Sequence, residues 1–327
     1  MQPFSTLRRQ VLIAAMAAVV APAAMAQAPS WPSTTITLVN PYAAGGPADT
    51  LARTLARQLE SRLQQTVIVD NKAGGAATIG TGFVARAKPD GYTLLIGTSA
   101  GHVVTPLMQK ISYDGVADFA FVGVVANQPN VLVAHPSLGV KTVAELIALA
   151  KREPDSLNYA SAGAGGATHL GGVMFQQRAG IRITHVPYPG AAPALKDVVG
   201  GQVQLGMLNL GGVLPFVKSG KLVALAYGSG KRSELLPDVP TMAEAGVSQA
   251  ESSTWYTLSV PRGTPEPIVK KLHDALDATL ADPSFGEFLL SQGAERMVLT
   301  PAATTAFVQE DKRQMERLLA SMGSLAK

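Results

Sequence analysis

Pro41-Tyr42-Ala43-Ala44-Gly45-Gly46-Pro47-Ala48-Asp49 is the stretch that decides the fold. The β-branched run before it, residues 35–40, predicts a strand, and the leucines after it recur every four residues, as on one face of a helix: Leu51, Leu55, Leu59 and Leu63. A strand-to-helix turn is where a parallel α/β sheet usually binds its ligand. Two glycines let a ligand approach the backbone, and the N–H groups of the helix start favour an anion. The alternative is a tight turn that binds nothing.

Length and composition predict a protein of about two domains with a substantial core. The chain has 327 residues, of which 47% are apolar and 15% charged, enough to bury a large core. It has no cysteine, which excludes disulfides, thiolate metal sites and a lipoprotein anchor on cysteine.

The first residues have the pattern of an export signal. Arg8-Arg9 precede an uncharged apolar run, residues 11–20, and Ala24-Met25-Ala26 forms an Ala-x-Ala cleavage site. We therefore predict a signal peptide over residues 1–26, cleaved before Gln27, and a periplasmic mature protein. The twin arginines leave both the Sec and the twin-arginine route open.

The charge of the mature chain argues against a nucleic-acid partner. Without Arg8 and Arg9 the 27 basic residues become 25, against 23 acidic ones, and we find no cluster of lysines and arginines.

Strand and helix patterns alternate along the chain, which predicts parallel α/β layers. The expected strands are residues 35–40, 66–70, 93–96, 121–125, 131–134, 157–160, 185–186, 203–207, 222–226 and 255–260. The clearest helices are residues 143–151, with a capping-box spacing at Thr142 and Glu145, and residues 265–280, 285–292 and 301–321.

Four turns that follow strands are rich in Gly, Ser and Thr and contain neither Lys nor Arg: residues 43–49, 74–80, 97–102 and 161–168. If they converge, they would hold a carboxylate through backbone N–H groups, hydroxyls and helix starts. Each hydrogen bond to a charged group contributes roughly 1.5–3 kcal/mol. Three or four of them, less the cost of immobilisation, approach the ~8 kcal/mol of a micromolar complex.

Twelve segments in order along the chain carry a family resemblance: 41–49 (PYAAGGPAD), 70–75 (DNKAGG), 89–94 (PDGYTL), 97–99 (GTS), 129–133 (PNVLV), 141–146 (KTVAEL), 158–163 (NYASAG), 168–170 (THL), 185–188 (HVPY), 201–203 (GQV), 231–233 (KRS) and 236–241 (LPDVPT). Through them the chain resembles the Bug family of periplasmic solute receptors, the extracytoplasmic receptors of tripartite tricarboxylate transporters.

The resemblance implies a two-lobed α/β fold of the periplasmic-binding-protein type II (Venus-flytrap) class. Lobe 1 would hold residues 28–128 plus 255–327 and lobe 2 residues 129–254, with a hinge near residues 126–127 and 253–254. It implies a monomeric receptor, not an enzyme, that captures a small carboxylate without metal or cofactor. The receptor would present the solute to transporter subunits in the membrane, or to a sensor.

The turns and the resemblance together predict a set of ligand-binding residues: Tyr42, Ala43, Ala44, Gly45, Gly46, Asp49, Thr98, Ser99, His102, Ser161, Gly165, Thr168, His169 and Asn209. Tyr42 would either pack over its turn or form a wall against the ligand. His102 and His169 would either hydrogen-bond their turns or contact the ligand. Asp49 would brace its turn with the carboxylate aimed away, because an acid at a helix start competes with a bound anion.

Two departures from the family pattern point to a less polar pocket. Members often carry an acid where this chain has Leu208, and Asn and Ser where it has Ala164 and Gly166. We therefore hypothesise a ligand whose far end is apolar, such as an aromatic carboxylate.

A serine hydrolase is the rival function, because residues 97–101 match the G-x-S-x-G nucleophile elbow around Ser99. Against it, Pro106 should interrupt the helix that must follow the nucleophile. A dinucleotide site, a P-loop and a histidine metal site lack their motifs: Thr168 replaces the third glycine after Gly163-x-Gly165, no G-K-[ST] follows a glycine turn, and no H-E-x-x-H occurs.

Overall fold

The computed structural model describes residues 31–322, so the predicted signal peptide and its cleavage site lie outside the described residues. The strands and helices all belong to one compact unit, Thr34–Lys327. The strands are β1 (Ile36–Asn40), β2 (Val67–Asn71), β3 (Thr93–Thr98), β4 (Phe119–Ala134), β5 (Asn158–Ser161), β6 (Thr184–Pro187), β7 (Leu205–Asn209), β8 (Val223–Tyr227) and β9 (Ser253–Pro261).

The α-helices are α2 (Pro47–Leu63), α3 (Thr78–Ala85), α4 (Thr105–Met108), α5 (Val143–Arg152), α6 (Ala167–Ala179), α7 (Ala191–Val199), α8 (Leu210–Lys218), α9 (Glu266–Ala281), α10 (Pro283–Ser291) and α11 (Pro301–Met322). Short 3-10 turns occupy η1 (Gly75–Ala77) and η3 (Pro136–Leu138), and a π-helical turn occupies η2 (Ala100–Val104).

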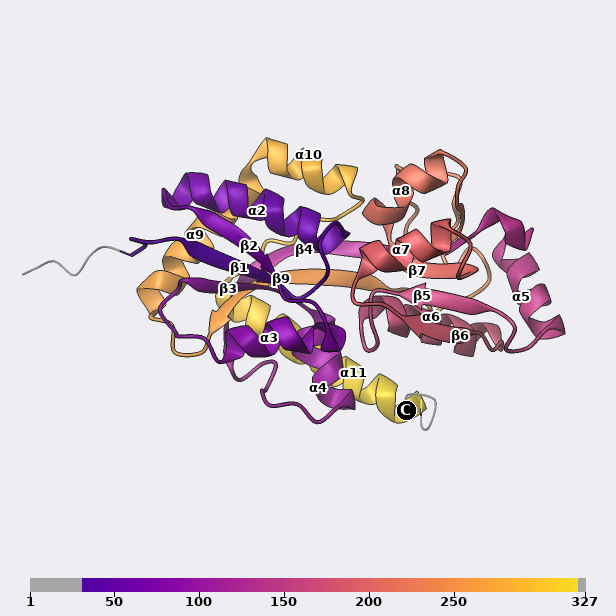
Figure 1. Ribbon diagram of the computed structural model, residues 1–327, viewed down its shortest axis with the longest axis horizontal. Coiled ribbons are helices and arrows are strands. Elements are labelled where there is room, and N and C mark those ends of the chain that lie inside the picture. Colours follow the sequence, from indigo (N-terminus) through magenta and orange to yellow (C-terminus); the bar gives the residue numbers. More distant parts are fainter. Residues whose placement is uncertain (1–30, 323–327) are drawn as a thin grey trace, which may run out of the picture. The chain divides into compact units, whose positions relative to one another are not determined.

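The strands form two sheets that share the long strand β4. In the first sheet β1 pairs in parallel with β2 and β3, and β9 lies antiparallel between β3 and β4. Helices α2, α9 and α10 cover one face of this sheet, and α3, α4 and α11 cover the other (Figure 1). In the second sheet the end of β4 pairs antiparallel with β7 and β8, while β5 pairs in parallel with β6 and β7.

The expected parallel pairing is present in part of each sheet, but β4, β8 and β9 run antiparallel to their neighbours. The two strands expected at 121–125 and 131–134 are one strand, β4, which continues through Gln128-Pro129. Pro129 lies where β4 changes partners: it pairs with Ser253 of β9, and the next residue pairs with Asn209 of β7. A change of partner is a position where a strand tolerates the missing N–H of proline.

Local signals in the sequence account for two of the helices. The leucine stripe of α2 is confirmed: Leu51, Leu55, Leu59 and Leu63 are all buried. Burial of each such side chain contributes about 1.5–3 kcal/mol. The capping box before α5 is also confirmed, since Thr142 Oγ1 accepts from the Glu145 N–H and the Glu145 carboxylate accepts from the Thr142 N–H.

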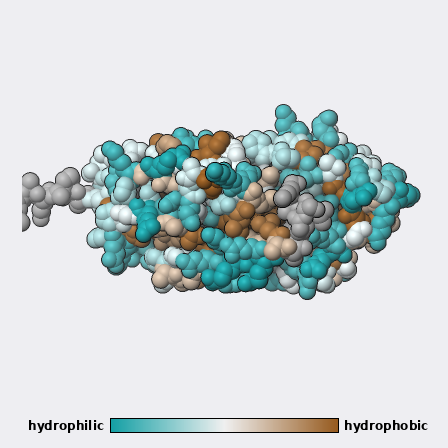
Figure 2. Space-filling view, turned by 90° about the horizontal axis from the view of Figure 1, so that it is seen from below, coloured by the Kyte–Doolittle hydropathy of each residue, from teal (hydrophilic) through white to brown (hydrophobic). Residues whose placement is uncertain are grey.

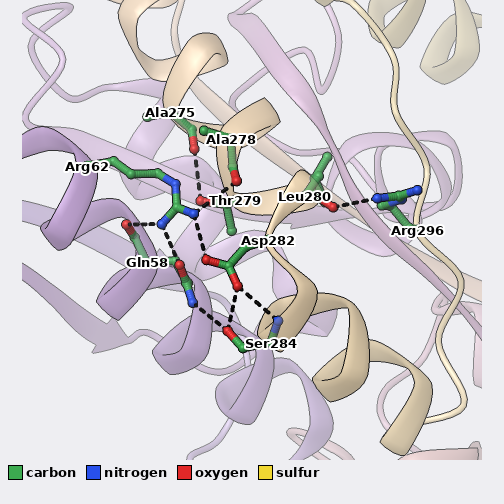
Figure 3. A network of polar contacts seen from close by, with 9 residues as sticks. All are labelled: Gln58, Arg62, Ala275, Ala278, Thr279, Leu280, Asp282, Ser284 and Arg296. Carbon is green, nitrogen blue, oxygen red and sulfur yellow. Dashed lines mark hydrogen bonds and ion pairs between the residues drawn. The ribbon is translucent and has the colours of Figure 1, made fainter.

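A polar network fixes α2 against α9 and α10 (Figure 3). Arg62 of α2 donates to the carbonyl oxygen of Ala278 and forms an ion pair of 3.0 Å with Asp282, which caps α10. Asp282 Oδ1 also accepts from the backbone N–H (2.9 Å) and the hydroxyl (2.7 Å) of Ser284. The network holds the helix that begins at the glycine turn.

Hydrophilic side chains predominate on the face seen from below, and hydrophobic residues gather near its middle (Figure 2). A few large hydrophobic side chains are exposed along the described chain, among them Ile79, Leu290 and Val298. Within residues 31–322, no helix is both long and apolar enough to cross a membrane.

The Asp282 cap predicts a pH-dependent contribution to stability. Hydrogen bonds from Ser284 and from Arg62 lower the pKa of Asp282 from 3.8 to about 2. Because this folded-state pKa lies below the unfolded-state value, the stabilisation is fully present above about pH 4 and is lost as the pH falls towards 2. We therefore predict that Asp282→Asn lowers the urea midpoint at pH 7, and that the difference from the wild type shrinks between pH 4 and pH 2.

Urea titrations of both proteins across this range measure the effect. The matched control is Asp274→Asn, which removes an exposed ion pair with Lys270 and should change the midpoint little. A midpoint difference for Asp282→Asn that stays constant down to pH 2 would contradict the assignment.

Candidate functional site

One pocket collects residues from all four glycine-rich turns. It is lined by Tyr42, Ala43, Gly46, Pro47, Ala48, Ala76, Thr98, Ser99, Ala100, Ala162, Gly163, Ala164, Gly166, Ala167, Thr168, Ala191, Asn209, Thr254 and Tyr256. Strands β1, β3, β5, β6 and β7 all end beside it, each leading into a helical segment. The pocket thus lies at the carboxyl ends of these strands, the usual position of a ligand site in α/β sheets.

Four helices begin at this pocket: α2 after Gly46, α6 after Gly166, α7 after Gly190 and α8 after Asn209. Among the residues that the structure describes, no side chain caps the N-terminus of any of these four helices by a hydrogen bond. The N–H groups of a first helical turn have no partner inside the helix, and the helix dipole places partial positive charge there. The pocket is therefore electropositive through its backbone.

Within the described chain, none of the lining residues is charged. The polar side chains are hydroxyls and one amide. Tyr42 and Thr98 share a hydrogen bond of 2.7 Å, and burial raises the pKa of Tyr42 to about 12, so its phenol stays protonated. Thr168 Oγ1 accepts from the Ala162 N–H and fixes the turn between β5 and α6. The arrangement can hold an anion by neutral donors.

Asn209 ties the pocket to the two long strands. Its amide donates to Asn130 Oδ1 (2.9 Å) on β4 and to Thr254 Oγ1 (3.0 Å) on β9. Asn130 in turn donates to Ser252 Oγ, whose hydroxyl donates to the carbonyl oxygen of Ala167 in α6. This buried network links the start of α6 to β4, which the two sheets share, and to β9.

Asp49 braces the first turn, as expected, and its carboxylate does not line the pocket. Oδ2 accepts from the Gly45 N–H (3.0 Å) and from Arg53 (3.0 Å), and Oδ1 accepts from Asn71 (2.9 Å). Burial raises the pKa of Asp49, but the hydrogen bonds from Arg53, Gly45 and Asn71 outweigh it and leave the pKa below its usual value. The negative charge is thus neutralised behind the turn.

Two histidines stack behind the second-sheet turn. The rings of His169 and His185 lie 4.0 Å apart, His169 Nδ1 accepts from the Gly165 N–H, and a 2.7 Å hydrogen bond joins His185 Nε2 to Ser161. Burial lowers the pKa of His169 to about 4; burial and the neighbouring His169 lower that of His185 to about 3. Both rings are therefore uncharged at neutral pH, and both support the turn.

His102 lies in the core of the first sheet and not on the pocket. Its Nδ1 lies 2.6 Å from the carbonyl oxygen of Gly115, and its ring packs against Phe119 and Phe121. Burial lowers the pKa of His102 to about 4. The structure therefore favours the structural alternative for this residue.

The structure brings half of the predicted site residues to the pocket wall: Tyr42, Ala43, Gly46, Thr98, Ser99, Thr168 and Asn209. The others lie behind or beside the same turns: Ala44, Gly45, Asp49, His102, Ser161, Gly165 and His169. Sequence reasoning missed lining residues such as Ala48, Ala76, Ala191 and Tyr256. Ala48 adjoins the predicted residue Asp49, but nothing marks Ala191 or Tyr256 in the sequence.

One of the two departures from the family pattern, which led us to infer a less polar pocket, does not face the pocket. Leu208 is buried in the core of the second sheet, beside Val131 and Val133. Ala164 and Gly166, the second departure, do line the pocket. The inference therefore rests on these two small residues alone.

Turns from the two sheets touch above the pocket. The Ala43 N–H donates to the carbonyl oxygen of Pro189 (3.2 Å). A Cβ at position 190 would lie 3.1 Å from the Ala43 nitrogen, and a Cβ at Gly163 would lie 3.7 Å from the Ala76 Cα. The small residues here allow the backbones to meet.

Ser99 has the surroundings of a structural hydroxyl. It donates to Asp311 Oδ2 (2.8 Å), whose pKa burial raises, and among residues 31–322 it has no histidine as hydrogen-bond partner. The expectation that Pro106 interrupts the following helix is wrong: η2 leads directly into α4, which accepts Pro106 in its first turn. Proline has no backbone N–H to donate, and a residue in the first turn of a helix does not need one.

A protein-family model described as "Tripartite tricarboxylate transporter family receptor" matches residues 51–324. Protein BugT of Bordetella pertussis is 35% identical over 307 residues, which cover 93% of this chain and 94% of BugT.

Solved structures agree. The periplasmic binding protein BugD superposes with a TM-score of 0.86 at 38% identity, over 90% of this chain and 99% of that one. R. palustris Rpa4515, solved with adipate, superposes with a TM-score of 0.87 at 36% identity, over 90% of this chain and 98% of that one. MatC from Rhodopseudomonas palustris, solved with bound malate, superposes with a TM-score of 0.83 at 32% identity, over 88% of this chain and 99% of that one. The chain belongs to the tripartite tricarboxylate transporter receptor family: it has the two-lobed fold of periplasmic binding proteins and is a solute receptor, not a hydrolase.

Proposed function

We propose that this receptor captures a small carboxylate in the pocket and delivers it to membrane subunits of a tripartite transporter. The observation that carries the proposal is that four helix starts without side-chain caps meet at a pocket wall that, among the described residues, has no charged side chain. The structural neighbours solved with adipate and malate support the same ligand class.

Neutral donors suit a receptor that must also release its ligand. A buried ion pair would carry a large desolvation cost that its geometry must offset. Backbone N–H groups that already point into the pocket hold an anion without that burden. Asp49 does not oppose the anion, because Arg53 and Asn71 hold its carboxylate on the far side of the turn.

The lobes that we propose are residues 28–128 plus 255–327 and residues 129–254, with the hinge near residues 126–127 and 253–254. The pairing of these segments supports the assignment, since Asn127 pairs with Trp255 and Gln128 with Thr254 where β4 and β9 run together. We further propose a periplasmic monomer, exported by a signal that is cleaved before Gln27.

A thermal-shift panel tests the ligand class. Acids such as benzoate, hexanoate, malate and adipate are compared with neutral analogues such as benzamide and hexanamide. We predict that at least one acid raises the melting temperature and that its amide does not, because only the anion gains from the helix starts. Stabilisation by the neutral amides, with none by any acid, would refute the proposal.

The contact between the two turns gives a second prediction. Gly190→Val places methyl groups against Ala43, which forces the turns apart where they meet. Overpacking of this kind costs about 1–3 kcal/mol, so we expect the affinity for the acid found in the panel to fall about 5- to 150-fold. The melting temperature of the ligand-free protein should change much less.

The matched control is Gly286→Val, because the same side chain at Gly286 of α10 meets open space. Calorimetric titrations of both variants measure the affinities. Equal affinities of the wild type and Gly190→Val would show that the contact between the turns does not take part in binding.

A further inference from the structure

A second cavity adjoins the pocket and shares part of its wall. It is lined by residues 74–77, 162–164 and 187–189, together with Tyr42 and Gln109. Five of these also line the first pocket: Tyr42, Ala76, Ala162, Gly163 and Ala164. Gly75, Gln109, Pro187 and Pro189 are exposed, so the second cavity lies at the surface.

The two spaces differ greatly in size. The pocket at the helix starts has a cavity volume of about 30 Å³, room for roughly two water-sized groups such as the two oxygens of one carboxylate. The adjoining cavity has a volume of about 280 Å³. A solute whose carboxylate lies at the helix starts therefore has space for the rest of its skeleton past the shared wall.

The lining of the second cavity favours an uncharged tail. None of its described lining residues is charged. The Tyr188 hydroxyl donates to Asp197 (2.7 Å), which places a negative charge directly behind this wall. A second carboxylate here would meet no cation in the wall and would lie near Asp197. The rings of Pro187, Tyr188 and Pro189 offer apolar surfaces instead.

The shared wall has a backbone that is costly to build. Ala76 and Ala77 have positive φ values of 53° and 75°, a region that non-glycine residues rarely adopt. The Thr105 hydroxyl holds the segment in place by donating to the Ala76 carbonyl oxygen (3.1 Å). Strain of this kind tends to occur at functional sites, which agrees with a wall that contacts the solute.

We propose that the solute is a monocarboxylate with an uncharged, apolar tail, which passes between Ala76 and Ala164 into the second cavity. This rests on the proposed capture of a carboxylate at the helix starts. Ala164 is then a specificity-determining residue, because its small side chain keeps the passage open.

Calorimetry with matched acids tests the tail. Hexanoate and adipate have the same six-carbon chain and differ in the second carboxylate, and 3-phenylpropionate tests an aromatic tail. We expect hexanoate or 3-phenylpropionate to bind at least about tenfold more tightly than adipate. Tighter binding of adipate or malate than of every monocarboxylate would overturn the inference.

Ala164→Leu tests the passage, with Ala302→Leu on the exposed start of α11 as the control. We expect Ala164→Leu to weaken hexanoate and 3-phenylpropionate about tenfold or more, and Ala302→Leu to leave the binding of both acids unchanged. If acetate stabilises the wild type and the long acids bind it and Ala164→Leu equally, the inference about the tail fails alone. If no acid stabilises the wild type, the proposed function fails with it.

Discussion

The N–H groups of a first helical turn need partners from outside the helix, and this fold brings four such turns to one pocket. Much of the surrounding structure serves to keep that place open to an anion. Asp49, the one acid in these first turns, is bound to Gly45, Arg53 and Asn71 behind its own turn. The neighbouring histidines, His169 and His185, are partly buried and uncharged at neutral pH. The positive potential at the pocket therefore comes from oriented peptide groups.

Size is the second constraint, and it explains why the site is rich in alanine and glycine. Turns from both sheets meet above the pocket, and the Ala43 N–H reaches the Pro189 carbonyl oxygen. Larger side chains at Gly163 or Gly190 would push these backbones apart. In the proposed binding mode the small side chains of Ala76 and Ala164 leave the passage from the pocket into the second cavity open, so specificity also depends on small residues.

The sequence alone predicts the elements well and their pairing poorly. The leucine stripe of α2 and the capping box of α5 are local signals, and both are present in the structure. The antiparallel course of β4 and β9 has no local signal, because it follows from contacts between residues more than a hundred positions apart. Helices α7 and α8 were not predicted from the sequence. Both are short, so their apolar pattern covers few turns, and Pro215 lies inside α8.

The site follows the same rule. Glycine-rich turns such as residues 43–49 mark the pocket in the sequence, whereas Ala191 and Tyr256 reach it only through the tertiary fold. Leu208 shows the opposite error, since a position inferred from the family pattern points into the core.

A crystal structure of the protein with a bound carboxylate tests the central claim most directly. The account predicts carboxylate oxygens within about 3 Å of backbone nitrogens in the first turns of α2 and α6, such as those of Ala48 and Thr168, with no Lys or Arg side chain in contact. A carboxylate held by a lysine or arginine, or bound away from these helix starts, would contradict it.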